Sequence, residues 1–132
     1  MDLAEVDQQA WWDQAAWVPQ RIHTAGGTVR THVDPSEAAT PEDLAAAARL
    51  TGLDTALAAL PLGWDTPLQA AVGGLTSGLS VGQTHRLELT RAVLRGSRLV
   101  VLDEPTAHLA PEDEQGIVQA MRALADTGAA VV

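Results

Sequence analysis

The order of apolar and polar residues along the 132-residue chain predicts alternating strands and helices. Four successive apolar residues at 99–102 predict a parallel strand that is covered on both faces. A second strand is predicted at 15–18, where Pro19 ends it, and a third begins within 129–132. Helices are predicted over residues 41–50, 54–60, 81–95 and 111–127. This order of elements is typical of an α/β fold.

Capping residues set the limits of the longer helices. Thr40 suits the start of one helix, and Ser80 suits the start of another, which Gly96 ends. Residues 28–33 fit either a short helix or an extended segment. Residues 61–78 are rich in Gly, Pro and Thr, and are therefore predicted to form a loop rather than a buried element.

Composition indicates a core with few large side chains. Hydrophobic residues make up 46% of the chain, but many of them are Ala, Phe and Tyr are absent, and four Trp supply all the aromatic groups. These Trp side chains are predicted to serve in packing rather than as stacking platforms. A core of Ala, Leu and Val buries little area per residue, and at about 25 cal/mol per Å² it is marginal on its own. We therefore expect the chain to be part of something larger.

Charge and missing residue types exclude several functions. The 17 acidic and 8 basic residues give a net charge of −9, which repels phosphate backbones, so no nucleic-acid partner is expected. All basic residues are Arg, which excludes a phosphate-gripping P-loop lysine within the chain, and the absence of Cys excludes zinc–thiolate sites and thiol nucleophiles. The four His lack metal-binding spacing, and most are predicted to be solvated or capping residues. No apolar stretch reaches the roughly 18 residues of a membrane-spanning helix.

Two adjacent carboxylates, Asp103 and Glu104, follow the apolar run at 99–102. In open α/β sheets, ligands collect at the carboxyl ends of the strands. Successive side chains of an extended chain point in opposite directions, so one carboxylate can hold a hydrated Mg²⁺ while the other orients or deprotonates a water molecule. The alternative, that a polar loop simply follows the strand, is equally consistent with these residues.

The start of the predicted helix at 81–95 is a candidate anion site. Free backbone N–H groups and the helix dipole act there together, Ser80 adds a hydroxyl donor, and Gly82 leaves an oxyanion room to approach the backbone. The first turn contains no acid. The alternative is an ordinary Ser-capped helix, which the local sequence taken alone favours.

Residues 78–82 also match G-x-S-x-G, the nucleophile elbow of serine hydrolases, with Asp103 and His108 following in the expected order. That motif requires a hydrophobic strand directly before the serine, whereas residues 71–77 have the composition of a loop. Asp103 and His108 are also only five residues apart, while the elbow fold takes its acid and base from distant loops. A hydrolase is therefore disfavoured.

Together these motifs resemble the nucleotide-binding subunit of the ATP-binding cassette (ABC) transporters. Residues 17–20 resemble the strand that leads to the Q-loop glutamine, here Gln20. Residues 79–83 resemble the family signature Leu-Ser-Gly-Gly-Gln, and residues 86–92 resemble the helix that follows it. Residues 99–104 resemble the Walker B strand with its terminal acids, and residues 105–109 the approach to the D-loop. Within the family, the sequence is most similar to exporters, and among these to the bacterial thiol-reductant (cysteine/glutathione) exporters.

The resemblance implies a P-loop NTPase-like α/β fold, in which residues 1–132 form a partial nucleotide-binding domain. Residues from about 20 to 96 would form the Q-loop and the helical signature subdomain, and residues from about 97 to 132 would form the Walker B strand, D-loop and following helix of the parallel-sheet core. The Walker A loop and the switch histidine are absent, so we expect the isolated chain to be inactive. Val81 and Ala110 replace a signature glycine and the D-loop aspartate.

The resemblance also implies roles for individual residues in an ATP- and Mg²⁺-dependent ATPase that works as a head-to-tail dimer. Glu104 would polarise the attacking water, Asp103 would bind Mg²⁺ through water, and Gln20 would reach Mg²⁺ or that water. Three signature residues would stabilise the γ-phosphate of the ATP held by the partner cassette, namely Ser80, Gly82 and Gln83.

The partners that the resemblance implies are the transmembrane domain of an ABC exporter and a second nucleotide-binding domain, in a homodimer or a heterodimer. The location implied is the cytoplasmic face of the plasma (inner) membrane. The alternative, which the departures at Val81 and Ala110 suggest, is a non-catalytic or degenerate cassette that acts only through partner binding.

Overall fold

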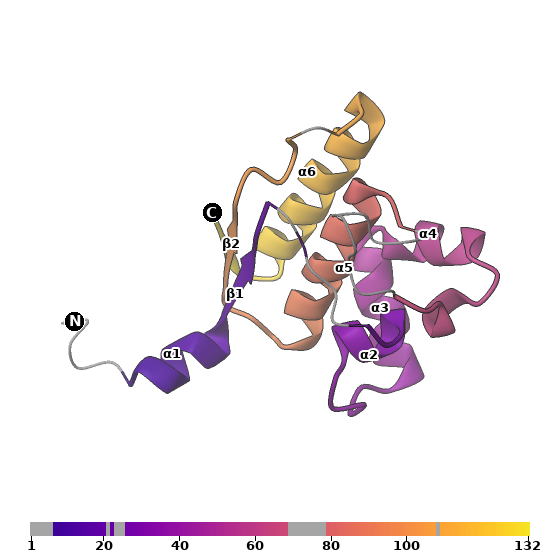
Figure 1. The fold of residues 1–132 in the computed structure, drawn as a ribbon. Helices are drawn as coiled ribbons and strands as arrows, with labels where there is room; N and C mark the ends of the chain where they lie inside the picture. Colours follow the sequence, from indigo (N-terminus) through magenta and orange to yellow (C-terminus); the bar gives the residue numbers. More distant parts are fainter. Residues whose placement is uncertain (1–6, 21, 23–25, 69–78, 108) are drawn as a thin grey trace.

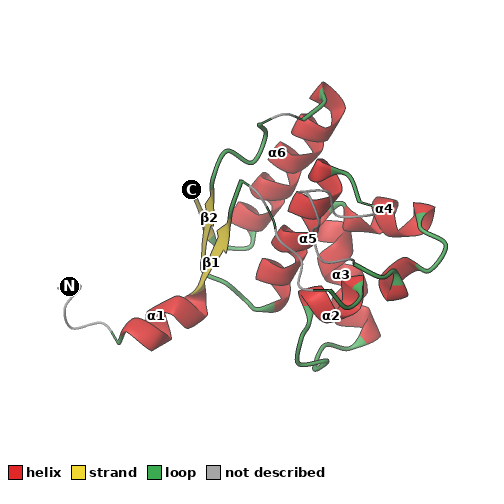
Figure 2. Cartoon of the chain, in the orientation of Figure 1, coloured by secondary structure: helices red, strands yellow, loops and turns green. Residues whose placement is uncertain are grey.

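The computed structural model describes residues 7–20, 22, 26–68, 79–107 and 109–132, and it shows an α/β arrangement (Figures 1 and 2). The sheet contains β1 (Ala15–Val18), β2 (Leu99–Leu102) and β3 (Ala130–Val131). The helices are α1 (Gln8–Gln14), α2 (Val29–Val33), α3 (Pro41–Thr51), α4 (Leu53–Ala59), α5 (Val81–Leu94) and α6 (Pro111–Asp126). The predicted α/β fold is confirmed.

The three strands form a parallel sheet in the order β1–β2–β3. One face of the sheet packs on α5 and α6, and there Val18 and Val100 are buried (Figure 1). On the opposite face Trp17, which pairs with Val101 in the register, is 66% exposed, and Val101 is 36% exposed. The prediction that the strand at 99–102 is covered on both faces is therefore wrong, because the described helices pack on one face alone.

Helix α5 lies between the sheet and helices α2, α3 and α4, and it contributes to both hydrophobic clusters (Figure 1). Its Leu89 belongs to the cluster under the sheet, together with Val100 and with Leu124 of α6. Its Leu87 belongs to the cluster of the helical part, together with Leu44 of α3. Residues two apart on a helix point to nearly opposite sides. Helix α5 therefore joins the helical part to the sheet.

Reciprocal side-chain caps start several helices, and the sequence predicts the cap at Thr40. The Thr40 hydroxyl accepts a hydrogen bond from the Asp43 N–H over 3.1 Å, and the Asp43 carboxylate accepts one from the Thr40 N–H over 3.2 Å. Residues 28–33, which the sequence allowed to be either a short helix or an extended segment, contain helix α2. Its start has the same reciprocal pattern, between Thr28 and Thr31. Such caps satisfy N–H groups that have no partner within the helix.

The tryptophans were predicted to serve in packing, but those of the N-terminal part are largely exposed. Trp11 and Trp12 lie on α1, a helix that the sequence did not predict, and they are 40% and 60% exposed. Trp64 packs against the helical cluster, as predicted. No helix among the described residues is long and apolar enough to cross a membrane.

Residues 61–68 contribute to the core, although the sequence predicted a loop without a buried element. They contain a 3₁₀ turn at Gly63–Asp65, and Leu68 is 2% exposed. The Leu68 N–H donates to the Gly27 carbonyl over 2.7 Å, which ties this segment to the start of α2. The rest of the predicted loop, residues 69–78, lies outside the described residues.

Candidate nucleotide-binding site

The carboxyl ends of β1 and β2 bring three predicted site residues to one edge of the sheet. Asp103 and Glu104 directly follow β2, and Gln20 lies two residues beyond the end of β1. The Asp103 N–H donates to the Val18 carbonyl over 3.0 Å, so the pairing of the strands continues up to the first carboxylate. All three candidate residues are exposed. This edge therefore offers carboxylate and amide groups to a ligand, at the position where α/β sheets bind ligands.

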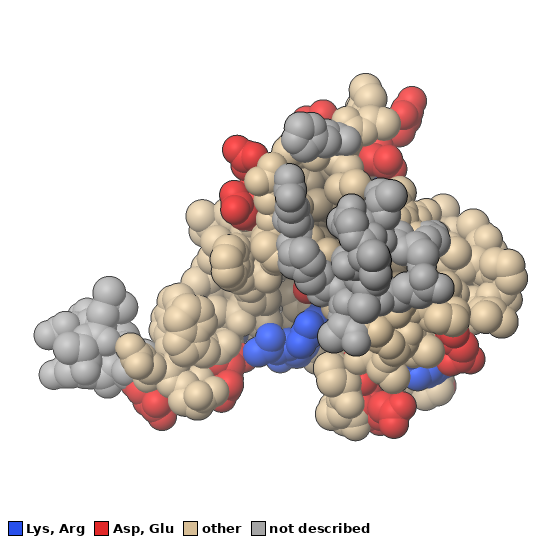
Figure 3. All heavy atoms as spheres, in the orientation of Figure 1, with Lys and Arg blue, Asp and Glu red and all other residues tan. Residues whose placement is uncertain are grey.

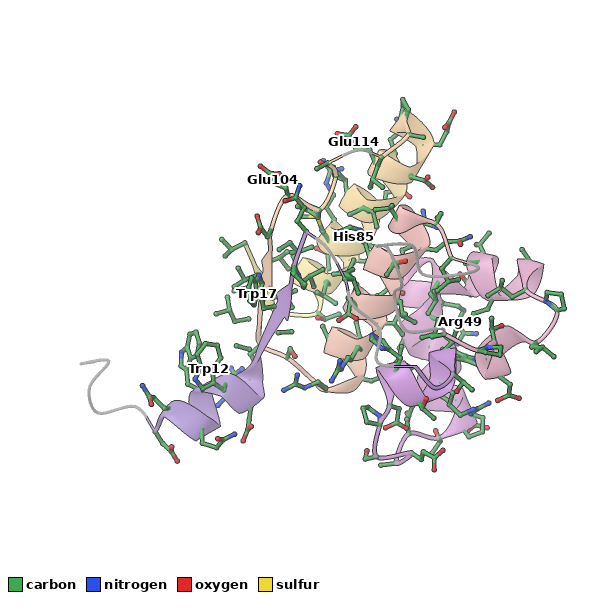
Figure 4. The ribbon with its side chains drawn as sticks, viewed as in Figure 1. Trp12, Trp17, Arg49, His85, Glu104 and Glu114 are labelled. Atoms are coloured by element: carbon green, nitrogen blue, oxygen red, sulfur yellow. The ribbon has the colours of Figure 1, made fainter. Side chains whose placement is uncertain are left out.

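Glu104 has a backbone conformation that is uncommon for residues other than glycine. Its φ is 46°, in the left-handed region, which costs an L-residue about 1–2 kcal/mol. Its carbonyl accepts a hydrogen bond from the Ala107 N–H over 3.1 Å, which closes a turn soon after β2. Figure 4 shows Glu104 at the same end of the molecule as Glu114 of α6. Strain of this kind clusters at functional sites, and here it falls on the residue predicted to be catalytic.

The second group of predicted residues lies at the N-terminus of α5. The Ser80 hydroxyl oxygen accepts a hydrogen bond from the Gln83 N–H over 3.1 Å, and Gln83 Oε1 accepts one from the Ser80 N–H over 2.9 Å. In this cap, the side chains of Ser80 and Gln83 take part only through their oxygen atoms, which accept hydrogen bonds. The hydroxyl proton of Ser80 and the side-chain amide protons of Gln83 therefore remain as donors. The N–H groups of Val81 and Gly82 have no acceptor within the helix. The start of α5 therefore presents donors, as an anion site requires.

Gly82 is buried, and the position of its missing side chain faces α6. A Cβ atom at Gly82 would lie 3.2 Å from Cγ and 3.4 Å from Oδ1 of Asp113, in the first turn of α6. On the side of its missing Cβ atom, Gly82 is therefore packed against Asp113, and the predicted approach of an oxyanion to its backbone concerns the side of its N–H group. Any contact of Gly82 with an anion rests on its N–H group. Sequence reasoning missed Asp113, since several acids begin α6 and no pattern tells which of them faces α5.

Acidic side chains gather at the end of the molecule that carries both groups, over the start of α6 and the loop after β2 (Figure 3). The first turn of α6 contains Glu112, Asp113 and Glu114, which the positive end of the helix dipole favours. Within the described ranges, no group of three His, Cys, Asp or Glu side chains could hold a metal ion. The exposed Asp103 carboxylate nevertheless suits Mg²⁺, which proteins commonly hold through one or two carboxylates together with substrate phosphates.

Two of the histidines that were predicted to be mostly solvated or capping are instead internal. His32 Nε2 pairs with the Glu88 carboxylate between α2 and α5, and these side chains are 9% and 11% exposed. His85 is 2% exposed, and its Nδ1 lies 2.9 Å from the Val81 carbonyl (Figure 4). The other two histidines lie outside the described residues. Both described histidines therefore belong to the packing of the helices.

The structure places the predicted site residues in two groups on different elements. One group, at the sheet edge, consists of Gln20, Asp103 and Glu104, and the other, at the start of α5, of Ser80, Gly82 and Gln83. In the hydrolase hypothesis, which the sequence disfavours, Ser80 would be the nucleophile. In the structure, the Ser80 side chain caps helix α5. His108, which would be the base of such a hydrolase, and residues 71–77, which would have to form the strand before the serine, lie outside the described residues. The described geometry thus offers an acidic strand end and a separate donor-rich helix end.

A parallel sheet with acids at its strand ends, covered by a helix whose N-terminus offers anion donors, is typical of nucleotide-binding α/β domains, among them those of the P-loop NTPase class. Comparison with known families agrees. The family model described as "ABC transporter" matches residues 2–107, which is most of the chain. The chain therefore belongs to the ABC transporter family.

Similar proteins specify the type of transporter. The "Type I secretion system ATP-binding protein PrsD" of Rhizobium meliloti is 34% identical, and the match covers 100% of this chain and 23% of that protein. The "Glutathione/L-cysteine transport system ATP-binding/permease protein CydD" of Escherichia coli is 34% identical over 93% of this chain and 20% of that protein. A solved structure of "a bacterial Atm1-family ABC exporter with ATP bound" matches with a TM-score of 0.78 and 25% identity, over 99% of this chain and 22% of that one.

These matches confirm the predicted resemblance to the ATP-binding domain of ABC exporters. The chain spans between 20% and 23% of the length of these relatives. It therefore corresponds to only a part of each of these transporters.

Proposed function

We propose that this chain contributes to the ATP-hydrolysing unit of an ABC exporter. The observation that carries the proposal is the position of Asp103 and Glu104 at the carboxyl end of the central parallel strand, with a left-handed backbone at Glu104. An exposed carboxylate at this position is able to accept a proton from a water molecule that attacks a bound phosphate. Membership of the ABC transporter family supports ATP as the phosphate compound.

In this proposal the two groups of residues act on different ATP molecules of a pair of cassettes. Asp103 would hold Mg²⁺ through water, Gln20 would contact Mg²⁺ or the attacking water from the neighbouring strand, and Glu104 would orient and deprotonate that water. When bound, Mg²⁺ offsets the negative charge of the phosphates during phosphoryl transfer. The γ-phosphate of the partner's ATP receives hydrogen bonds from the donors at the start of α5, which are Ser80, Gly82 and Gln83.

The proposed partners are a second nucleotide-binding domain, identical or different, and the transmembrane domain of an exporter. Two relatives are named ATP-binding/permease proteins, which supports a transmembrane partner. The proposed location is the cytoplasmic face of the plasma (inner) membrane, where ATP is present.

One observation favours the second candidate function, a non-catalytic cassette. Val81 stands at a signature glycine position and is 51% exposed, and its β-branched side chain restricts the approach of a phosphate.

The test of the proposal is Glu104→Gln in a complete cassette that contains this chain. We expect ATP turnover to fall by about 10²–10⁴-fold, because Gln keeps the size of the side chain but cannot accept the proton. Binding of ATP should be retained. Glu112→Gln is the matched control, since it neutralises an exposed acid at the same end of the molecule, and it should keep its turnover.

Two results would change this interpretation. Wild-type turnover in Glu104→Gln would show that Glu104 is not the base. If the unmodified cassette binds ATP in an equilibrium titration and yet releases no phosphate, the non-catalytic candidate is favoured instead.

A further inference from the structure

The first turn of α6 places a negative charge beside the first turn of α5. The Asp113 carboxylate lies against Gly82, with Oδ1 3.4 Å from the position of a Cβ atom there. A Cβ atom is about 2.5 Å from the backbone nitrogen of its own residue, so Oδ1 lies within about 6 Å of the Gly82 nitrogen. The first turn of α5 contains no acid of its own. Asp113 therefore brings a carboxylate to a helix end that otherwise attracts anions.

No ion pair joins this carboxylate to a described residue. Arg86, one turn further along α5, directs its guanidinium to Gly116 of α6, and its Nη1 donates to the Gly52 carbonyl over 3.5 Å. The ion pairs that the described residues form join other side chains. The neighbouring acids of α6, Glu112 and Glu114, are exposed, so water screens their charges more strongly. The charge of Asp113 consequently acts on the start of α5 without an ion-pair partner among the described residues.

We propose that Asp113 sets the phosphate affinity of the signature end, which we define as residues 80–83, by opposing the positive end of α5. This inference rests on the proposed function, in which the signature end contacts a phosphate. A fixed carboxylate repels a free phosphate anion more than a phosphate whose charge Mg²⁺ offsets. Asp113 is thus a specificity-determining residue, which favours a charge-compensated nucleotide over inorganic phosphate and promotes the release of that product.

The experiment measures binding of inorganic phosphate to the 132-residue chain through the backbone amide resonances of Val81, Gly82 and Gln83. Sodium chloride keeps the total ionic strength near 0.15 M, where the Debye length is about 8 Å. Asp113→Asn removes one charge and keeps the shape of the side chain, and it should tighten binding about twofold or more. Raising the ionic strength to about 1 M, with a Debye length of about 3 Å, should abolish this difference.

Glu112→Gln is the matched control, because it removes the same charge from the same helical turn, at an exposed position one residue earlier. It should bind phosphate as the unmodified chain does. If Asp113→Asn fails to fold, Asp113→Ser removes the same charge with a smaller side chain, and the same gain is expected.

Three outcomes would overturn the inference. If removing the Asp113 charge leaves the affinity unchanged while the amide shifts still saturate, Asp113 has no such role, and the proposed phosphate contact of α5 stands. Equal gains in the Asp113 and Glu112 variants would show a general effect of acidity. If no variant shows saturable shifts at these amides, both the inference and the proposed phosphate role of the signature end fail.

Discussion

Gly116 of α6 lies directly against Arg86 of α5, and replacing this glycine by alanine gives a sharp prediction. A Cβ atom at Gly116 would lie 1.9 Å from Nη2 and 3.0 Å from Cζ of Arg86. Unstrained heavy atoms approach to about 3.5 Å, so the guanidinium would have to move by more than 1 Å. Arg86 is constrained, because its Nη1 donates to the Gly52 carbonyl and its Nε is buried without a hydrogen-bond partner among the described residues.

The expected free-energy change follows from two opposing effects. Overpacking at a buried contact costs about 1–3 kcal/mol. Alanine is favoured over glycine inside a helix by about 1 kcal/mol. Gly116→Ala should therefore lower the free energy of unfolding by up to about 2 kcal/mol. In a chain that already carries Arg86→Ala, the guanidinium is gone. There, Gly116→Ala should raise the free energy of unfolding by about 1 kcal/mol, so that the sign of the effect reverses.

The assay is urea unfolding followed by circular dichroism, for the unmodified chain, both single variants and the double variant. The free energies give a coupling energy between the two positions, which we expect to be about 1–3 kcal/mol. Gln119→Ala is the control, because this exposed position of α6 should respond equally with and without Arg86. If Gly116→Ala and Arg86→Ala are additive within about 0.5 kcal/mol, the guanidinium does not occupy the space beside Gly116, and the reasoning is refuted.

Two further predictions concern charged side chains of the helical part. Because the His32–Glu88 pair is nearly buried, Glu88→Ala should lower the free energy of unfolding by about 2–4 kcal/mol, and Leu at both positions should cost less. Equal urea midpoints for Glu88→Ala and the unmodified chain would contradict this. The Ala39 N–H donates to the Asp34 carboxylate, and this hydrogen bond holds the pKa of the carboxyl below its usual value. The stabilisation of the folded chain by the ionised Asp34 is therefore present above about pH 4, and it is lost as the pH falls through the lowered pKa. The melting temperatures of the chain and of Asp34→Asn should therefore differ at about pH 6 and converge in acid, whereas a pH-independent difference would contradict the assignment.

The features that the sequence predicts well depend on residues close together in the chain. Thr40 and Ser80 start helices because their hydroxyl groups reach N–H groups three residues later. The apolar run at 99–102 forms a strand, since four successive apolar side chains suit a parallel strand. The acids at 103–104 then lie at the sheet edge simply because the strand ends there. Each of these predictions needs only the local sequence and the geometry of the element.

The features that the sequence does not predict depend on contacts between distant segments. Nothing near Gly82 indicates that a carboxylate of α6 lies beside it, and nothing near Gly116 indicates a guanidinium. The exposed face at Trp17 is a similar case, because the apolar pattern of a strand does not tell which faces receive helices. The buried pairing of His32 with Glu88 likewise joins residues 56 positions apart. Each of these features arises only when the helices are packed together.

The order of elements makes α6 the part of the chain that both groups of candidate residues share. Strand β2 delivers the two acids to the sheet edge, and residues 105–110 after Glu104 lead directly into α6. The first turn of α6 brings Asp113 to the start of α5, and its second turn accommodates Arg86. This short segment with the first turns of α6 thus connects the acidic strand end to the donor-rich end of α5.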